Sequence, residues 1–340
     1  MTYLVGKIAL DITAGAPNNG RSFDNVAYTK KLSINGKTHP YVSAQAFRRW
    51  LRDSLPPSEA RSPVHRSVKG KRQQAYTKGR PDLYLDDDLF GFMVAEKKNS
   101  YQRDTVLATG TLVSVAPAKP EKDFGAMSRG FPADADPVLH EHEHYTAELA
   151  GDVLLDLPRI GVFELEGGLR RALSPAASSE ALAAGAEEVQ FRGVTSLRLD
   201  ITERRRRAAV LLRTLAEVRG GAKKALHYGD RAPALVLLAP LKGGNNPFTR
   251  VLAATPRGVV FDVDTFREEK EAWADELDGP IRIGWAPGFL GKQREDVRSK
   301  LTHEIEAGEV ILNHPRPLLK ELAASIEAGE YDHWFEDEPR

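Results

Sequence analysis

Three arginines in the stretch VSAQAFRRWLRDSL, residues 42–55, have a spacing that could bind a row of phosphates. Apolar residues recur there every three or four positions, which predicts an amphipathic helix capped by Ser43. Arg48 and Arg52 then lie one turn apart beside the apolar stripe, and Arg49 lies further round. Such a face suits a polyanion, although charged flanks are also the norm for solvated surface helices.

The start of the same helix offers a second means of holding an anion. Ser43 and Gln45 lie at the N-terminal end, where free backbone N–H groups and the positive end of the helix dipole favour negative charge. The helix therefore combines cationic side chains with a favourable terminus.

Charge is unevenly distributed along the chain, although 48 basic residues balance 48 acidic ones. Residues 43–80 contain ten Lys or Arg against two acids, and residues 203–224 contain eight against two. Residues 262–278 reverse this, with eight acids against Arg267 and Lys270. Segments of opposite charge indicate a protein that binds a polyanion on one face and keeps another face for other partners.

Composition places the chain among folded proteins. Its 340 residues are 41% hydrophobic and include no cysteine, which excludes disulfides and thiolate metal sites. No run of about 18 apolar residues predicts a membrane span. The N-terminal stretch MTYLVGKIALDITAG lacks the pattern of a signal peptide, so a cytoplasmic protein is expected.

Two strand–helix–strand units are expected. The first begins with a strand at 3–13 and the helix at 43–54, and the second joins strands at 193–201 and 233–240 through a helix at 203–218. Further strands are expected at 26–34, 105–117 and 144–157. This order resembles a ferredoxin-like or RNA-recognition fold, an α+β class in which the helices cover one face of an antiparallel sheet.

Three other segments are predicted to lack regular secondary structure. Residues 56–82 have almost no apolar content and predict a mobile basic loop, and residues 117–137 are rich in Pro and Gly. Residues 159–192 contain a low-complexity alanine-rich run and predict a hairpin or loop that extends from the body.

Four consecutive arginines, Arg204–Arg207, begin the helix at 203–218. Cations at a helix N-terminus oppose the dipole and cost up to about 1 kcal/mol each. Two interpretations follow: an acidic partner lies nearby, or the cluster is exposed to solvent and partly relieved by Glu203.

His140, His142 and His144 alternate along the chain, so on a strand they would share one face and could bind a divalent metal. No carboxylate with a recognisable spacing accompanies them. A polar junction between a loop and a strand explains the pattern equally well, and no metal or other cofactor is expected.

An ordered set of motifs spread from about residue 3 to about residue 250 points to a family. The set comprises Asn18-Asn19-Gly20, the helix residues Ser43, Gln45, Arg48, Arg49 and Arg52, the segment 86–93, Asp123-Phe124-Gly125, the segment 220–228 and the segment 243–248. In this order it resembles the DevR family, the repeated backbone subunit of type I-B CRISPR surveillance complexes of the Cascade type.

The resemblance implies an RNA-recognition palm with large finger and thumb insertions. Residues 1–54 would form the first part of the palm, and residues 55–192 the finger and thumb insertions interleaved with palm strands. Residues 193–340 would complete the palm and add C-terminal helices. Many copies would line up along one CRISPR RNA, each thumb passing over the RNA held by its neighbour.

The resemblance also implies which residues bind RNA. Ser43, Gln45, Arg48 and Arg52 are the first candidates, and Arg49 and Arg21 are weaker ones. The basic loop and the glycine-rich stretches add candidates that could equally be ordinary tight turns or solvated cations: Lys69, Lys71, Arg72, Gly220, Gly221, Lys223, Asn245 and Asn246. A subunit that accepts any guide should contact phosphates and leave base edges free.

The implied role is a scaffold without catalytic residues. Its partners would be CRISPR RNA, target DNA through the guide, further copies of itself, and the large and 5′-handle subunits of the complex, with no membrane. One alternative is an endoribonuclease of similar fold, with His65, His227, Asp24 or Asp11 as candidate catalytic residues. Another is a DNA-binding regulator, which the lack of a helix-turn-helix pattern disfavours.

Overall fold

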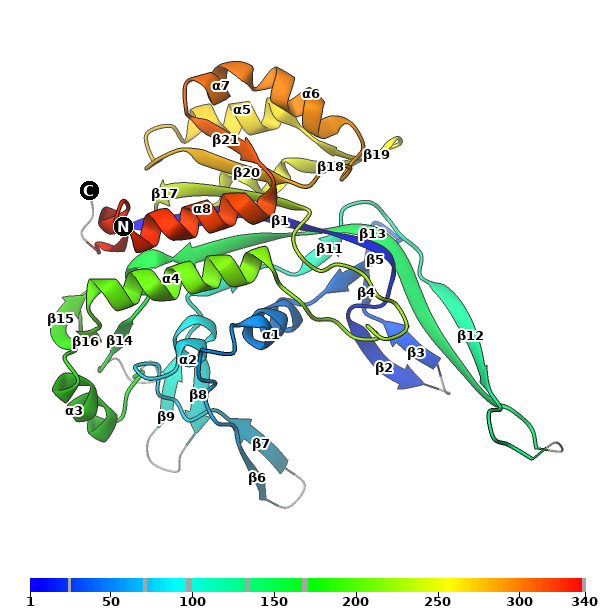
Figure 1. Cartoon of the computed structure of the whole chain (residues 1–340), viewed down its shortest axis with the longest axis horizontal. Coiled ribbons are helices and arrows are strands. Elements are labelled where there is room, and N and C mark those ends of the chain that lie inside the picture. The colour runs from blue at the N-terminus through cyan, green and yellow to red at the C-terminus, as the bar shows by residue number, and fades with distance from the viewer. Residues whose placement is uncertain (24–25, 70–71, 96–99, 133–134, 167–170, 338–340) are drawn as a thin grey trace.

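The computed structural model describes residues 1–23, 26–69, 72–95, 100–132, 135–166 and 171–337, and its body is one large mixed sheet (Figure 1). The main path of the sheet runs, in spatial order, through β21 (Val310–Asn313), β20 (Ile281–Trp285), β17 (Leu235–Lys242), β1 (Thr2–Gly15), β13 (Val138–Asp156), β11 (Leu112–Ser114), β5 (Lys37–Val42) and β4 (Lys31–Ile34). Neighbours on this path are antiparallel except β20 and β21, which are parallel.

Strand β1 lies at the centre of the sheet because its sequence is apolar on both faces. Leu4 and Ile8 pack into a core on one side, and Val5 and Ala9 into a core on the other. Gly6 permits close approach between strands, since a Cβ there would lie 1.9 Å from the carbonyl oxygen of Leu237. The predicted strand at 3–13 is confirmed.

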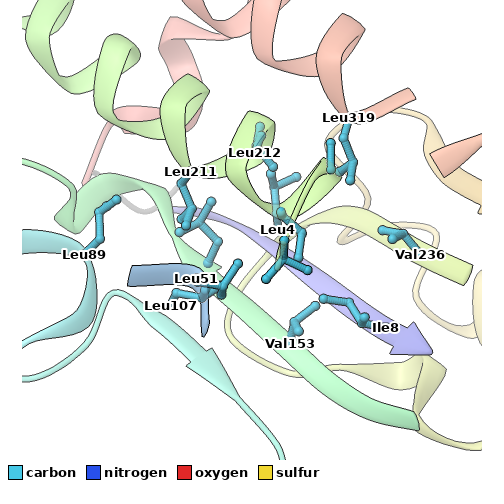
Figure 2. Packing of buried hydrophobic residues seen from close by; sticks show 14 of the residues in the cluster. Leu4, Ile8, Leu51, Leu89, Leu107, Val153, Leu211, Leu212, Val236 and Leu319 are labelled. Carbon is cyan, nitrogen blue, oxygen red and sulfur yellow. The ribbon is translucent and has the colours of Figure 1, made fainter. Parts of the chain in front are cut away.

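One face of the sheet is covered by α1 (Ala44–Ser54), α4 (Ile201–Ala216) and α8 (Pro315–Glu327). Figure 2 shows Leu211 and Leu212 of α4, with Leu319 of α8, against Leu4 and Val236 of the sheet. Both predicted helices are therefore present, with boundaries within two residues of those expected.

The opposite face carries α5 (Val263–Ala272), α6 (Gln293–Lys300), α7 (Thr302–Glu306) and the hairpin of β18 (Leu252–Thr255) and β19 (Gly258–Phe261). Phe266 of α5 and Val297 of α6 belong to the same core as Val5 and Ala9. The expectation that helices cover one face only is therefore wrong for the C-terminal third of the chain. No described helix is long and apolar enough to cross a bilayer.

The segments expected to be irregular contain regular structure. Residues 56–82 include a hairpin of β6 (His65–Lys69) and β7 (Arg72–Tyr76), and residues 117–137 include β12 (Glu121–Met127), which pairs along β13. The expected loops are corrected at these positions, because pairing with a neighbouring strand supplies order that local composition does not indicate.

Residues 159–192 are corrected in the same way. They contribute β14 (Val162–Glu164), α3 (Pro175–Ala183) and β15 (Glu187–Phe191), which pack with β16 (Val194–Arg198) around a small core of their own. The structure also contains α2 (Leu85–Phe90), β8 (Phe92–Ala95) and β9 (Ser100–Arg103) near α1, and β2 (Asn19–Phe23), β3 (Val26–Thr29) and β10 (Leu107–Thr109) around β13 (Figure 1).

Candidate nucleic-acid interface

An open pocket of about 260 Å³ lies on the polar side of α1 and is lined by Gln45, Arg48, Arg49, Arg52, Phe90 and Gly91. Four of these six residues belong to the predicted set. The pocket therefore places the cations of α1 side by side, as the helical spacing predicted.

The buried side of α1 fixes the orientation of this cationic face. Ser43 caps the helix by accepting a hydrogen bond from the backbone N–H of Ala46 at 3.4 Å, and Asn18 Oδ1 accepts one from the N–H of Ser43 at 3.0 Å. Phe47 and Trp50 are buried and pack edge to face, with ring centroids 6.1 Å apart. The helix cannot rotate without exposing these rings, so the arginines stay directed at the pocket.

Arg48 has the least neutralised charge of the three arginines. It donates one hydrogen bond, from Nη1 to Thr109 Oγ1 at 3.1 Å, and has no carboxylate partner among the residues that the structure describes. Burial lowers the pKa of its guanidinium, and the neighbouring charge of Arg52 adds to this effect. Two adjacent cations with few counter-charges favour an anion between them.

Arg52 and Arg49 are partly occupied by partners in the chain. Arg52 lies 5.4 Å from the ring centre of Phe90, with its Nε 3.6 Å from Asp86 Oδ2, and donates long hydrogen bonds to the carbonyls of Asp86 and Gly91. Arg49 is exposed and pairs with Asp53 at 2.7 Å. Phe90, which sequence reasoning did not select, lies in the acidic motif at 86–93 and holds Arg52 in place.

Of the two predicted glycines at 220 and 221, Gly220 packs against α1, and Gly221 lies beside Pro17 and Arg231. A Cβ on Gly220 would lie 2.5 Å from the Trp50 ring, so only glycine fits there, and the N–H of Ala222 donates to the carbonyl of Pro17 at 2.8 Å. With the hydrogen bonds between Ser54 Oγ and the backbone of Arg219, these contacts place the start of the loop at 219–232 beside the C-terminal half of α1. Lys223 follows in the same loop with a positive φ of 55°.

Other predicted residues lie elsewhere. Arg21 is exposed on β2. Lys69 and Arg72 pair at the end of the β6–β7 hairpin, which projects from the body in Figure 1, and Lys71 lies outside the described residues. Asn246 donates from Nδ2 to the carbonyl of Gly6 at 2.7 Å beside the core on the sheet face opposite α1, and exposed Asn245 precedes it. None of the described residues among these lines the α1 pocket.

Three of the four arginines that begin α4 have acidic partners within the chain, and the fourth, Arg204, binds backbone carbonyls. Arg207 is buried and pairs with Asp88 at 2.7 Å and Glu203 at 2.8 Å. Arg204 is buried and donates to three backbone carbonyls, those of Pro158, Ile160 and Phe335. Arg205 pairs with Asp332, and Arg206 with Glu203 and Glu59. The interpretation that an acidic partner lies nearby is therefore confirmed, and the exposed-cluster interpretation is wrong.

The histidines at 140, 142 and 144 lie within β13, so their placement on a strand is confirmed and the interpretation as a loop-to-strand junction is wrong. His142 is buried, and its Nε2 lies 2.7 Å from Nε2 of His227 and 3.4 Å from Asp123 Oδ2. Burial lowers the pKa of both imidazoles of this pair. No group of three or more His, Asp or Glu side chains is arranged to hold a metal ion within the described part of the chain.

The other candidate catalytic residues are dispersed. His65 packs against Tyr76 in the β6–β7 hairpin, Asp11 is exposed on β1, and Asp24 lies outside the described residues. Among the described candidates, only His227 has a second imidazole within hydrogen-bond distance, and that partner is buried away from solvent.

Comparison with known proteins gives one relative in sequence and a shared fold. No protein-family model matches the chain. An alignment 132 positions long, which covers 34% of this chain, is 33% identical to a protein of Myxococcus xanthus (strain DK1622) described as "CRISPR-associated protein Cas7/Cst2/DevR", and the match spans 43% of that relative's own length. This finding confirms the predicted resemblance to the DevR family.

Two solved structures share the fold of almost the whole chain. A chain of a "CRISPR RNA-guided surveillance complex, pre-nicking" matches with a TM-score of 0.56 at 12% identity, covering 96% of this chain and 100% of that one. A chain of a "CRISPR RNA-guided surveillance complex" matches with a TM-score of 0.54 at 14% identity, covering 96% and 99%. At these identities the likeness establishes the mixed α/β fold.

Proposed function

We propose that this chain, a relative of the DevR family, is a non-catalytic RNA-binding backbone subunit of a type I-B CRISPR surveillance complex. Copies of the chain assemble along one guide RNA and present it for pairing with target DNA. The observation that carries the proposal is the α1 pocket, where Arg48 and Arg52 lie one turn apart along the capped helix, with Gln45 of its first turn in the same lining. The partners are CRISPR RNA, further copies, and the large and 5′-handle subunits.

The central strands support an RNA-recognition palm. The order β17, β1, β13, β11 is antiparallel throughout, with α1 between β1 and β11 in sequence and α4 between β13 and β17. Two strand–helix–strand units with helices on one face are the pattern of a ferredoxin-like fold. The β6–β7 hairpin then corresponds to part of the finger.

The chemistry of the pocket supports sequence-independent binding. Guanidinium groups and a helix start bind phosphates, which carry no sequence information, so one subunit can hold any guide. Arg48 is available to bind a phosphate, because no carboxylate of the described chain competes for it.

The nucleic acid that co-purifies with the chain tests this function. We expect intact RNA of defined length, bound with an affinity whose logarithm falls linearly with the logarithm of salt, at a slope of about −2 to −3 per copy for three or four phosphates on a single strand. Extraction and sizing of the bound RNA measure its length, and salt titration measures the slope. Duplex DNA in place of RNA would overturn the proposal, and cleavage of added RNA by the purified chain would support the endoribonuclease alternative.

A further inference from the structure

A second pocket, of about 380 Å³, is lined by the loop at 219–232, the end of α4 and the start of α8, and by no residue of α1. Its charged lining consists of Glu217, Arg219, Lys224, Asp230, Arg231 and Arg316. Four cations against two acids leave an excess of two positive charges.

The two acids of this pocket are already engaged. Glu217 pairs with Arg316 at 2.8 Å and Lys320 at 2.5 Å. Asp230 Oδ1 accepts hydrogen bonds from the backbone N–H groups of Arg231 and Ala232. The charge of Asp230 acts on Arg231, but neither carboxylate forms a direct ion pair with its guanidinium among the described residues.

Arg231 differs from the other buried arginines of the described chain. Its exposed fraction is 3%, yet it donates one side-chain hydrogen bond, from Nη1 to the carbonyl of Asp230 at 2.9 Å, and its buried Nε has no acceptor among the described residues. Arg103 and Arg207, by contrast, share the carboxylate of Asp88 and donate to several carbonyls. A buried cation without a directly paired carboxylate is costly, unless an anion bound from outside takes that place.

Glycines surround this guanidinium. A Cβ on Gly229 would lie 2.8 Å from Nη1, and one on Gly221 would lie 3.4 Å from Nε. The hydroxyl of Tyr145, buried beside Arg231, also lacks a partner among the described residues. Burial lowers the pKa of Arg231, so its charge is poorly solvated and attracts an anion strongly.

An exposed aromatic ring completes the site. Tyr228 is 84% exposed, and Lys224 Nζ lies 5.9 Å from its ring centre. A large exposed ring beside unpaired cations is the usual arrangement for single-stranded nucleic acid, in which a base stacks on the ring and cations bind the adjacent phosphate.

We propose that Arg231, Lys224 and Tyr228 form a second nucleic-acid site, which binds a phosphate of a single strand and stacks one base on Tyr228. The site is separate from the α1 pocket and does not require it. The strand is either the guide beyond α1 or the DNA paired with it, since both offer the same phosphate and base chemistry.

The test uses the full chain and short labelled oligouridylate and oligothymidylate probes, with affinity measured by fluorescence anisotropy. Tyr228→Ala should weaken binding roughly tenfold, because stacking on one aromatic ring is lost, whereas Tyr228→Phe should retain it. Lys224→Ala should bring the salt slope closer to zero by about 0.7. Arg257→Ala, at the exposed β18–β19 turn, is the matched control and should change neither.

Arg231→Met separates a binding role from a structural one. If the guanidinium awaits an anion, the variant without nucleic acid should unfold at the same or a higher temperature, because an unpaired buried charge has been removed, yet it should bind the probes more weakly. A lower unfolding temperature with unchanged probe affinity would overturn the proposal.

Repeating the measurements with guide RNA, and then with its DNA complement, identifies the strand. A loss in Tyr228→Ala at the guide step assigns the site to the guide, and a loss only on addition of DNA assigns it to the target. Unchanged binding in both steps would overturn the second site, while an effect of Arg48→Ala would still support the proposed function.

Discussion

Helices α1 and α4 both carry adjacent arginines, and they lie on the same face of the sheet, but their arginines have different surroundings. On α4, Arg204 and Arg207 are buried and bind carbonyls and carboxylates of the chain. On α1, Arg48 faces an open pocket with a hydroxyl as its hydrogen-bond partner. The α4 set is therefore part of the structure, whereas the α1 set keeps its charge for a ligand.

The acidic helix α2 accounts for this difference. Asp88 lies deep enough to pair with both Arg103 and Arg207 and also accepts the N–H of Gly161 at 3.0 Å. Asp86, from the same helix, accepts a hydrogen bond from the N–H of Ser62 and lies 3.6 Å from Arg52 Nε at the edge of the α1 pocket. The number of arginines on a helix thus says less about its function than the number of carboxylates within reach.

The largest effect is expected from Asp88→Ala. The change leaves Arg103 and Arg207 buried without their shared carboxylate, so the free energy of unfolding should fall by about 3–5 kcal/mol. Urea unfolding followed by circular dichroism measures this loss. Asp332→Ala removes the partner of Arg205 at the surface and should have little effect; equal losses in the two variants would contradict the contrast between buried and surface pairs.

The second prediction concerns the α1 set. Arg48→Ala combined with Arg52→Ala should weaken guide binding uniformly over unrelated guide sequences and bring the salt slope closer to zero by about 1.4, since two phosphate contacts are lost. Titrations of several guides at a fixed number of copies per RNA measure both quantities. A loss confined to certain guides, or an unchanged slope, would show that this helix face is only solvated.

Sequence reasoning predicted the elements whose signals are local. The strand at 3–13 and the capped helix with its buried Phe47 and Trp50 follow from apolar periodicity and a serine cap, and both are confirmed. The hairpin within 56–82 and the strand β12 were missed, because their order comes from pairing with another strand. Composition does not encode that partner.

The candidate site was likewise predictable only where it depends on local spacing along the chain. Helical spacing was sufficient to place Gln45, Arg48 and Arg52 in one pocket. Spacing could not show that Phe90 packs under Arg52, or that Asn246 belongs to the opposite face of the sheet, because these positions depend on long-range contacts. The unpaired state of Arg231 is invisible in sequence for the same reason.

A third prediction uses the histidine pair, whose partners come from two elements of the fold. His142 and His227 face each other, with Asp123, Lys223 and His144 close to the pair. Burial lowers both pKa values below 6.5, so the folded state favours the neutral forms. Their contribution to stability is then present above about pH 6.5 and is lost as the pH falls toward the folded-state pKa values.

Urea unfolding at several pH values between about 7.5 and 5.5 measures this loss. His142→Gln should flatten the pH dependence, and His65→Gln, in the separate β6–β7 hairpin, is the control. Replacing His140, His142 and His144 together should leave the length of bound RNA unchanged; uncut precursor in that variant would support a nuclease. A stability that rises on acidification would contradict the buried neutral pair.

The smallest effect is expected from Arg49. Its exposed ion pair is intermediate between the internally bound arginines of α4 and Arg48 of α1, which has no carboxylate partner among the described residues. Its ion pair with Asp53 is exposed at one helical turn, so Arg49→Ala should lower the free energy of unfolding by no more than about 0.5 kcal/mol. If Arg49 also contacts a phosphate, the salt slope should move closer to zero by about 0.7.

Asp53→Asn is the matched variant, because it removes the competing carboxylate and keeps the arginine. It should strengthen RNA binding if Arg49 exchanges Asp53 for phosphate, and should leave affinity unchanged if the pair merely caps the edge of the pocket. Salt titrations of the two variants side by side therefore decide whether the cationic face of α1 has two arginines that contact RNA or three.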